Sequence, residues 1–434
     1  MKNIFLFSLM ILLFARHALP QPQPRNDLVV IPGKLNNQKL VQKFYQKKGQ
    51  ALFWFQCNES VALRNRLRAM LDSAEYMALE KENYHYSWIK DNLNFYSADS
   101  QVMRAADYLY TDAVISYCKD IFQGSGIEEW LDYDEISPKY EAADNSYIVM
   151  GLSAVTCENE LQWFVNFLER NDREYLSLKQ ELRRRIDSAD QAEVRKLSQS
   201  INQLRWMKHF GFRNYIVVNA ASAVVRYYAC DTVQLRMKAV VGTPATPTPR
   251  FAGYCTDVVF YPYWHVPYSI AVNEIIPQVK RNPAYLESRN LQLIDGAGTV
   301  LDPGTINWSA ISTANFPYRF RQSTGCDNAL GVIKFNLTDP FSVYMHDTNN
   351  KTAFLAGARY FSHGCIRLES PVELAMALLP GQVDEDFLEA CRKDQKPGSL
   401  KLLEPVPVFV VYMTSEYDQD SKVKYYKDVY RLIR

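Results

Sequence analysis

The sequence has almost no net charge, few histidines and no long apolar run beyond its first residues. Lys and Arg number 49 against 48 Asp and Glu, a net charge of +1, so binding to nucleic acid or to anionic lipid through charge is not expected. No later stretch is long and apolar enough to cross a membrane. With 47% hydrophobic and 22% charged residues over 434 positions, the chain is typical of a globular protein of two or three domains.

The first twenty residues predict the compartment. Lys2 provides a short positive start, and residues 4–14 form an eleven-residue run that is apolar except for Ser8. That length suits a signal peptide better than a membrane span, which needs roughly 20 apolar residues. We therefore expect a signal peptide at 1–20, a polar linker at 21–37, and export to the periplasm or cell envelope.

Two of the six histidines lie close to one cysteine, in the stretch from Tyr344 to Arg367. Cys365 follows a glycine, with His363 two residues before it and His346 nineteen before it. A thiol becomes a useful nucleophile when a neighbouring imidazole stabilises the thiolate. A glycine lets backbone come close to a substrate, and neighbouring N–H groups can then line an oxyanion hole. Together these residue types indicate a cysteine acyl-transfer site.

Two ordinary alternatives apply to the same residues. A cysteine is often a small buried hydrophobe, and His346, His363 and Cys365 are also residue types that bind zinc. A structural zinc site usually has four ligands in paired short spacings, and no second cysteine lies near Cys365. The catalytic interpretation is therefore favoured, and neither a metal nor another cofactor is expected.

The remaining seven cysteines leave the disulfide pattern open. An exported protein normally pairs its cysteines. If Cys365 stays free, the other seven are an odd number and show no recognisable framework of spacings: Cys57, Cys118, Cys157, Cys230, Cys255, Cys326 and Cys391.

Residues 38–210 have the pattern of a mainly helical domain. Apolar residues recur at three- and four-residue steps from Val61 to Ala74, which is typical of an amphipathic helix. Residues 158–204 predict a helical pair, with Ser188 and Gln191 as a capping box at the start of its second member.

From Asn214 the pattern changes to β. Residues 215–219 and 223–228 are short β-branched runs around a small-residue turn and predict a hairpin. A strand at 341–346 is expected to carry His346 at its end, and residues 371–379 predict a helix. The fold class expected is α+β, with an N-terminal helical domain and a C-terminal mainly β domain.

The motifs in both halves resemble one protein family. Ser362-His363-Gly364-Cys365-Ile366-Arg367, preceded by His346-Asp347, resembles the signature of the L,D-transpeptidases with a YkuD-type catalytic domain. The helical half resembles the scaffold domain of the large, YcbB-like branch of that family. The matching pieces are Phe44-Tyr45 with Trp54, Leu79-x-x-x-x-Tyr84-His85, and Asp107-x-Leu109-x-Thr111-Asp112. The glycine-punctuated repeat of a separate peptidoglycan-binding module is not recognisable.

The resemblance implies a fold and an activity. It implies a helical scaffold at 38–210 and a YkuD-type β-sandwich at 213–434, with a capping insertion at about 267–318 over the active site. The implied reaction forms 3→3 cross-links between peptidoglycan stem peptides through a cysteine thioester, with release of D-alanine. The implied partners are a tetrapeptide donor and a diamino-acid acceptor, with other wall-synthesis enzymes as further candidates, and carbapenems would acylate the cysteine.

The resemblance also implies roles for individual residues. Cys365 is the expected nucleophile and His346 the base, oriented by a backbone carbonyl or by the Asp347 carboxylate. Arg367 is expected either to bind a stem carboxylate or to lock the cysteine loop. The candidates for holding the loop or lining the oxyanion site are His363, Gly364 and Tyr344.

Other functions stay open at this point. Water in place of the amine would make the protein an L,D-carboxypeptidase or a hydrolase that releases wall-bound proteins, because pocket shape and water exclusion choose the acceptor. A non-catalytic wall-binding scaffold is a further alternative. A papain-like protease is disfavoured, because its cysteine precedes its histidine in the chain.

Overall fold

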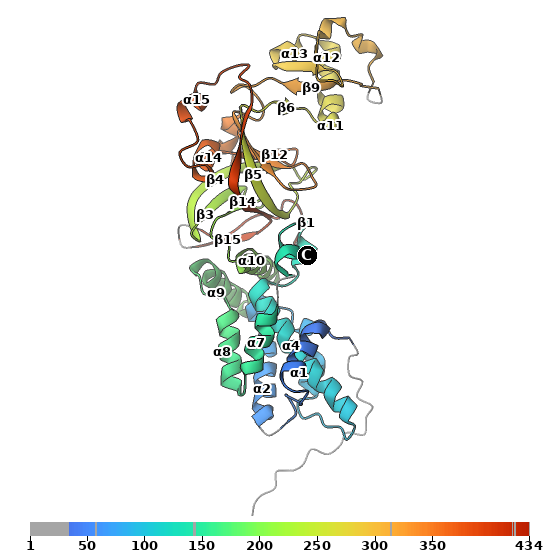
Figure 1. Cartoon of the computed structure of the whole chain (residues 1–434), viewed down its shortest axis with the longest axis vertical. Coiled ribbons are helices and arrows are strands. Elements are labelled where there is room, and N and C mark those ends of the chain that lie inside the picture. The colour runs from blue at the N-terminus through green and yellow to red at the C-terminus, as the bar shows by residue number, and fades with distance from the viewer. Residues whose placement is uncertain are drawn as a thin grey trace, which may run out of the picture. The chain divides into compact units, whose positions relative to one another are not determined.

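The structure, a computed structural model, describes residues 34–56, 59–141, 145–312, 315–418, 420 and 422–433. The expected signal peptide, most of the linker and Cys57 therefore lie outside the described residues. The chain divides into two compact units, coloured by residue number in Figure 1. One comprises Met1–Asp72, Lys81–Tyr117 and Val149–Phe164, and the other comprises Ser73–Glu80, Cys118–Ile148 and Val165–Arg434.

Helices dominate the first half of the chain, as expected. They are α1 (Gln38–Lys47), α2 (Glu59–Asp72), η1 (Ala74–Met77), η2 (Lys81–Tyr84), α3 (Tyr86–Asp91), α4 (Ser100–Gln123), α5 (Ile127–Trp130), α6 (Ser137–Glu141), α7 (Ser146–Ala154), α8 (Glu158–Leu168), α9 (Arg173–Asp187) and α10 (Gln191–His209). None of the described helices is long and apolar enough to span a membrane.

The predicted helical pair at 158–204 is in fact the three helices α8, α9 and α10. The predicted capping box is also wrong. The N-cap of α10 is Asp190, whose carboxylate accepts a hydrogen bond from the Glu193 N–H, whereas Ser188 ends α9. An aspartate nearer the helix start is an equally good cap and also carries charge that favours the N-terminus.

Polar residues of α4 hold the first unit together. The buried Asp107 carboxylate accepts hydrogen bonds from the backbone N–H groups of Phe53 and Trp54, at 2.9 and 2.8 Å, and from the Tyr45 hydroxyl. The Thr111 hydroxyl accepts from the Trp54 indole at 2.8 Å. These contacts join segments far apart in the chain, which explains why the scaffold-like motif pairs buried aromatics with polar residues.

The next turn of α4 adds a second set of such contacts. Asp112 accepts from the backbone of Asn36 and Asn37 at 3.0 and 2.7 Å and lies 2.7 Å from His85 Nε2. His85 therefore has a structural partner within the helical unit.

The second unit contains a ten-stranded sheet in the order β1-β5-β10-β11-β13-β4-β3-β2-β14, with β12 paired to β4. Its strands are β1 (Tyr133–Asp134), β2 (Tyr215–Asn219), β3 (Val224–Ala229), β4 (Thr232–Gly242), β5 (Phe251–Phe260), β10 (Ile333–Leu337), β11 (Tyr344–His346), β12 (Tyr360–Ser362), β13 (Ile366–Leu368) and β14 (Gly398–Val411). The long strand β14 also pairs with β5, so the sheet closes on itself (Figure 1). The expected α+β class is confirmed.

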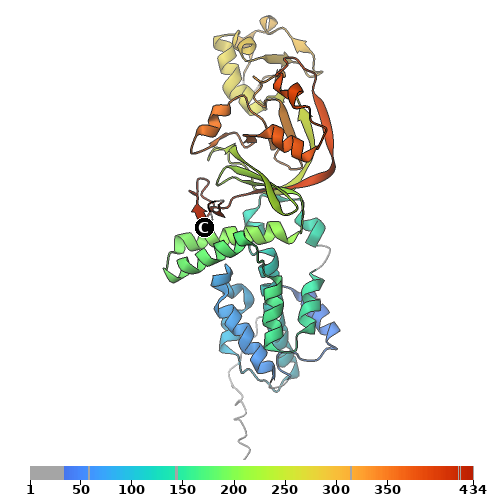
Figure 2. The ribbon, with the colours of Figure 1, turned by 90° about the vertical axis from the view of Figure 1, so that its left-hand side faces the viewer.

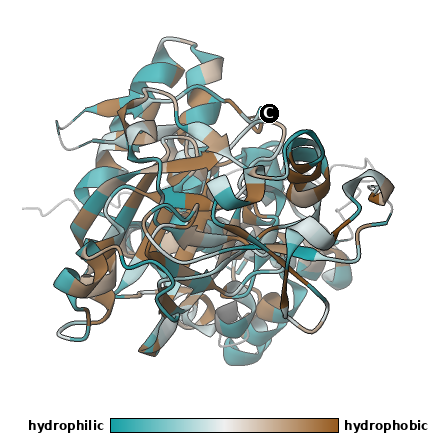
Figure 3. Cartoon of the chain, turned by 90° about the horizontal axis from the view of Figure 1, so that it is seen from above, coloured by the Kyte–Doolittle hydropathy of each residue, from teal (hydrophilic) through white to brown (hydrophobic). Residues whose placement is uncertain are grey.

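Alternate residues of these strands belong to two apolar cores. In β2, Ile216 and Val218 join one core, whereas Tyr215 and Val217 join another with the apolar sides of α9 and α10. Successive side chains of a strand point to opposite faces, so β2 is covered on both and is buried along its whole length. The helices α9 and α10 lie side by side in Figure 2. Figure 3 shows that helices of the chain carry both hydrophobic and hydrophilic residues. The first core also contains α14 (Pro371–Leu378) and α15 (Glu385–Glu389).

Residues near the expected insertion form a small layer with its own apolar core. Four strands pair in the order β6-β9-β7-β8 around short helices. The elements are β6 (Trp264–His265), α11 (Tyr268–Ile270), the π-helix η3 (Ala271–Ile275), α12 (Ile276–Arg281), α13 (Tyr285–Ser288), β7 (Leu291–Ile294), β8 (Val300–Leu301), η4 (Pro303–Thr305), η5 (Trp308–Ala310) and β9 (Arg319–Gln322).

The rest of the second unit includes η6 (Lys351–Leu355), β15 (Ser415–Tyr417) and β16 (Val423–Tyr425). A disulfide joins Cys326 to Cys391, 65 residues apart, where the chain returns from the insertion. Five cysteines of the described part are free: Cys118, Cys157, Cys230, Cys255 and Cys365.

Asp107→Ala should destabilise the helical unit. The substitution leaves two buried backbone N–H groups without their acceptor and removes one of the partners of the Tyr45 hydroxyl, which should lower the free energy of unfolding by at least about 2 kcal/mol. Calorimetry against Asp91→Ala, at the exposed end of α3, measures the difference. Equal stability of the two variants would contradict the structural role of Asp107.

Candidate functional site

The pairing of two short strands brings the sequence-predicted residues together. β11 and β13 run parallel, with Met345 beside Ile366 and His346 beside Arg367. Met345 and Ile366 are fully buried in the core of the closed sheet. Because side chains alternate along a strand, the opposite face of the two strands carries Tyr344, His346, Cys365 and Arg367.

His346 is held as a neutral base. Its side chain is 4% exposed, and Nδ1 hydrogen-bonds the backbone carbonyl of Asp347. A carbonyl only accepts, so Nδ1 carries the proton and Nε2 keeps its lone pair. Burial lowers the pKa of His346 to about 3, and the charges of Arg367 and Lys334 add to that shift.

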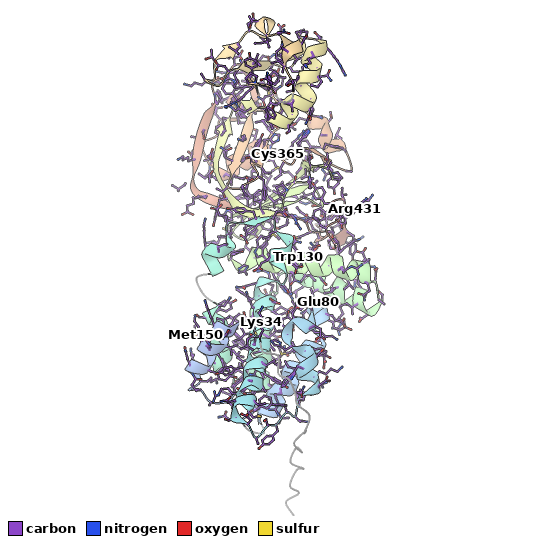
Figure 4. The ribbon with its side chains drawn as sticks, turned by 90° about the vertical axis from the view of Figure 1, so that its right-hand side faces the viewer. Lys34, Glu80, Trp130, Met150, Cys365 and Arg431 are labelled. Carbon is purple, nitrogen blue, oxygen red and sulfur yellow. A yellow bond between two sulfur atoms is a disulfide. The ribbon has the colours of Figure 1, made fainter. Side chains whose placement is uncertain are left out.

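Cys365, labelled in Figure 4, is half-buried at the start of β13. Burial raises the pKa of its thiol, whereas hydrogen bonding from the backbone and hydroxyl of Tyr344, and the charge of Lys334, lower it in part. No hydrogen bond joins the thiol to His346 in the described part of the chain. The resting pair is therefore a neutral thiol and a neutral imidazole, and the thiol interacts with Tyr344.

Hydrogen bonds within and around the loop set the position of the nucleophile. The Ser362 hydroxyl donates to the carbonyl of Cys365 at 2.6 Å and accepts from the Gly364 N–H at 3.1 Å. The carbonyl of Gly364 accepts from the Thr248 hydroxyl at 2.8 Å. Gly364 has a φ of 120°, which side-chain-bearing residues rarely adopt. Since its N–H is already donated to Ser362, Gly364 serves the site through its backbone conformation.

The Asp347 carboxylate is engaged away from the imidazole. One oxygen accepts from the Val332 N–H at 3.0 Å, and the other contacts Lys351 Nζ. A Cβ at Gly331 would lie 2.1 Å from this carboxylate, so only glycine leaves room for it. Two ways to orient His346 were expected, and the structure has the one in which the backbone carbonyl of Asp347 accepts from the imidazole.

The small layer of residues 264–322, called the insertion from here on, contacts the site at two points. Trp264 of β6 interacts electrostatically with the side chain of Tyr344, which interacts in turn with the Cys365 thiol. His363 is exposed, and its Nε2 lies 3.0 Å from Glu274 of η3. His363 thus joins the cysteine loop to the insertion.

Arg367 is half-buried beside His346 and forms no ion pair within the described part of the chain. Burial lowers the pKa of its guanidinium, and the nearby Cys365 opposes that shift. An anion of the substrate could therefore bind it.

In the residues that the structure describes, no group of three His, Cys, Asp or Glu side chains is arranged to hold a metal.

Three residues of the site were not expected from the sequence. Thr248 lies in the proline-rich loop 243–249, Trp264 opens the insertion, and Lys334 lies in the middle of β10. Of these, only Lys334 carried a signal, because a lysine between the apolar residues Ile333 and Phe335 of a core strand needs an explanation.

Comparisons with known proteins identify both halves of the chain. A family described as the L,D-transpeptidase catalytic domain matches residues 213–384, and a family described as a scaffold domain matches residues 39–182. A protein of Haemophilus influenzae, named a candidate L,D-transpeptidase, is 28% identical over 400 residues, which cover 92% of this chain and 78% of that protein.

Two solved structures show weaker likenesses. The catalytic domain of an Enterococcus faecium L,D-transpeptidase acylated by ertapenem has 18% identity and a TM-score of 0.22, covering 46% of this chain and 96% of that one. An L,D-transpeptidase from Mycobacterium smegmatis has 12% identity and a TM-score of 0.21, covering 46% and 58%. The family assignment rests on the two domain families and the curated relative.

The pH dependence of Cys365 alkylation should reflect a neutral resting pair. Because burial raises the pKa of the thiol and His346 is a neutral imidazole well above its pKa of about 3, the thiolate fraction should rise about tenfold per pH unit between about pH 6 and pH 9. Iodoacetamide inactivation rates over that range measure this. A plateau from about pH 4 to pH 8 would instead indicate a thiolate–imidazolium pair.

Gly364→Ala should impair the reaction of Cys365 without unfolding the protein. A Cβ has space there, with its nearest contact at 3.9 Å, but φ is unfavourable for alanine. The strain should displace the loop and slow alkylation about 10- to 100-fold. The control is Gly357→Ala, which has open space and an ordinary φ. Equal rates for the two variants would mean that the conformation of Gly364 does not position the nucleophile.

Proposed function

Since this chain belongs to the L,D-transpeptidases with a YkuD-type catalytic domain and a scaffold domain, we propose that it forms 3→3 cross-links between peptidoglycan stem peptides. The donor is a tetrapeptide stem, the acceptor is the side-chain amine of a second stem, and D-alanine is released. The observation that carries the proposal is the shared face of Tyr344, His346, Cys365 and Arg367, where a nucleophile, a base and an unpaired cation meet.

In the first half of the reaction, Cys365 is acylated. Its sulfur attacks the carbonyl carbon between the third stem residue and the terminal D-alanine, and His346 Nε2 takes the thiol proton. The Tyr344 hydroxyl, which contacts the sulfur, is suitably positioned to donate to the oxyanion. When the tetrahedral intermediate collapses, the carbon–nitrogen bond breaks and His346 returns the proton to the leaving amine.

In the second half, the thioester is resolved by an amine. His346 removes a proton from the incoming amine, whose nitrogen attacks the thioester carbonyl. The carbon–sulfur bond breaks, the thiolate of Cys365 regains the proton, and a new amide joins the two stems. The neutral state of His346 suits both steps, because each begins with proton abstraction.

The supporting roles follow from the contacts. Ser362, Gly364 and Thr248 hold the cysteine loop, and the Asp347 carbonyl orients the imidazole. Arg367 binds a carboxylate of the stem.

Stem peptides are found outside the cytoplasmic membrane, so we assign the protein to the periplasm or cell envelope, where other wall-synthesis enzymes are candidate partners. Carbapenems should acylate Cys365.

Cys365→Ala should abolish the reaction, and Cys230→Ala, at an exposed free cysteine, should not. The purified chain is incubated with disaccharide-tetrapeptide, and products are identified by mass spectrometry. A cross-linked dimer with loss of one D-alanine is expected, and deletion of the nucleophile should reduce its rate by about a thousandfold or more.

The products also separate the alternatives. Tripeptide monomer without dimer would mean that water resolves the thioester and that the protein is an L,D-carboxypeptidase. An unchanged rate in Cys365→Ala would overturn the catalytic assignment and leave a wall-binding scaffold as the better account.

A further inference from the structure

Lys334 lies in the same row of residues as the base and Arg367. In β10 it is directly opposite His346, which in turn is beside Arg367 of β13. Its neighbours Ile333 and Phe335 are fully buried in the core, so alternation points Lys334 to the outer face. Two cations thus flank His346, one from each neighbouring strand.

Lys334 has no acidic partner. It forms no ion pair or hydrogen bond with any residue that the structure describes, although it is half-buried. The nearest carboxylate known to influence it is Asp257, which is hydrogen-bonded to Asn336 at 2.6 Å and to Thr256 at 2.7 Å. A half-buried cation without a counter-ion is costly, and so such a residue is expected to have a function.

The position of the ammonium group indicates what it serves. Lys334 Nζ lies 4.3 Å from the centroid of the Tyr344 ring, and Tyr344 contacts the Cys365 sulfur. Cys365 immediately precedes β13 and Arg367 lies in it, so the acyl part of a donor attached to Cys365 would lie on that side of His346. The leaving residue departs on the other side, toward β10 and Lys334.

We infer that Lys334 binds the free carboxylate of the terminal residue that leaves the donor peptide, and so makes the site specific for a donor with one residue beyond the scissile bond. This inference rests on the proposed function. In the leaving residue, one carbon separates the scissile nitrogen from the carboxylate. That carboxylate lies within one residue's length of the scissile nitrogen, roughly 3.5 Å along an extended chain. A cation on the strand that pairs with the base is therefore suitably placed to bind it.

This role differs from that of a group that only stabilises the thiolate. A lysine that acts on the sulfur alone would change the reaction of every substrate and of iodoacetamide by the same factor. A lysine that also binds the leaving carboxylate adds a loss that is confined to substrates that carry it. The contrast between a terminal carboxylate and a terminal carboxamide therefore isolates the inferred contact.

The test compares disaccharide-tetrapeptide with its C-terminal carboxamide, in binding and in turnover. In the Cys365→Ala background, calorimetry should show about 10- to 100-fold tighter binding of the carboxylate form. Lys334→Met should remove that preference, Lys334→Arg should keep most of it, and Lys401→Met, an exposed lysine of β14, should leave it unchanged. With Cys365 present, kcat/KM for release of the terminal residue should show the same pattern, with alkylation by iodoacetamide confirming an intact thiol.

The binding and turnover results test the role of Lys334 and the transpeptidase activity separately. Equal binding of the two peptides by the wild-type site, no binding of either, or equal losses for both in Lys334→Met would overturn the role of Lys334. A clear binding preference that Lys334→Met removes, without any turnover, would support Lys334 and contradict the transpeptidase assignment.

Discussion

The parallel pairing of β11 with β13 is the constraint on which the site depends. It places Met345 and Ile366 in the core and so directs Tyr344, His346, Cys365 and Arg367 to the opposite face. A shift of one residue in either strand would exchange the two faces and bury the nucleophile. The closed sheet, the two cores and the pairing of β14 with β5 all stabilise this register. The chemistry is thus a consequence of the packing of the domain.

Around that pairing, each reactive group is positioned by backbone contacts. The Asp347 carbonyl sets the tautomer of His346. The hydroxyls of Ser362 and Thr248 hydrogen-bond the N–H and the carbonyl of Gly364, respectively. Burial keeps the imidazole and the thiol neutral, while Lys334 and Arg367 supply positive charge without acidic partners. The resting site therefore contains no thiolate–imidazolium pair. Its fixed positive charges instead stabilise the negative charge that develops in the transition state, which is preorganised electrostatic stabilisation.

The local features of this fold are predictable from the sequence, and the non-local ones are not. The hairpin at 215–228, the helix that begins at Pro371 and the His346–Arg367 stretch follow from periodicity and residue type. The capping box at Ser188 fails because Asp190 competes locally for the same role. The closure of the sheet, the Cys326–Cys391 pairing and the position of Lys334 opposite His346 depend on contacts between distant segments, which periodicity does not encode.

The central claim is that Cys365 becomes acylated by a stem peptide, and the intermediate can be observed directly. The purified chain is mixed with excess tetrapeptide donor, without an amine acceptor, and quenched rapidly in acid for mass spectrometry of the intact protein. The account predicts added mass equal to the donor less D-alanine, located on Cys365 and removed by hydroxylamine, as a thioester requires. An adduct on another residue, or no adduct while D-alanine is released, would contradict it.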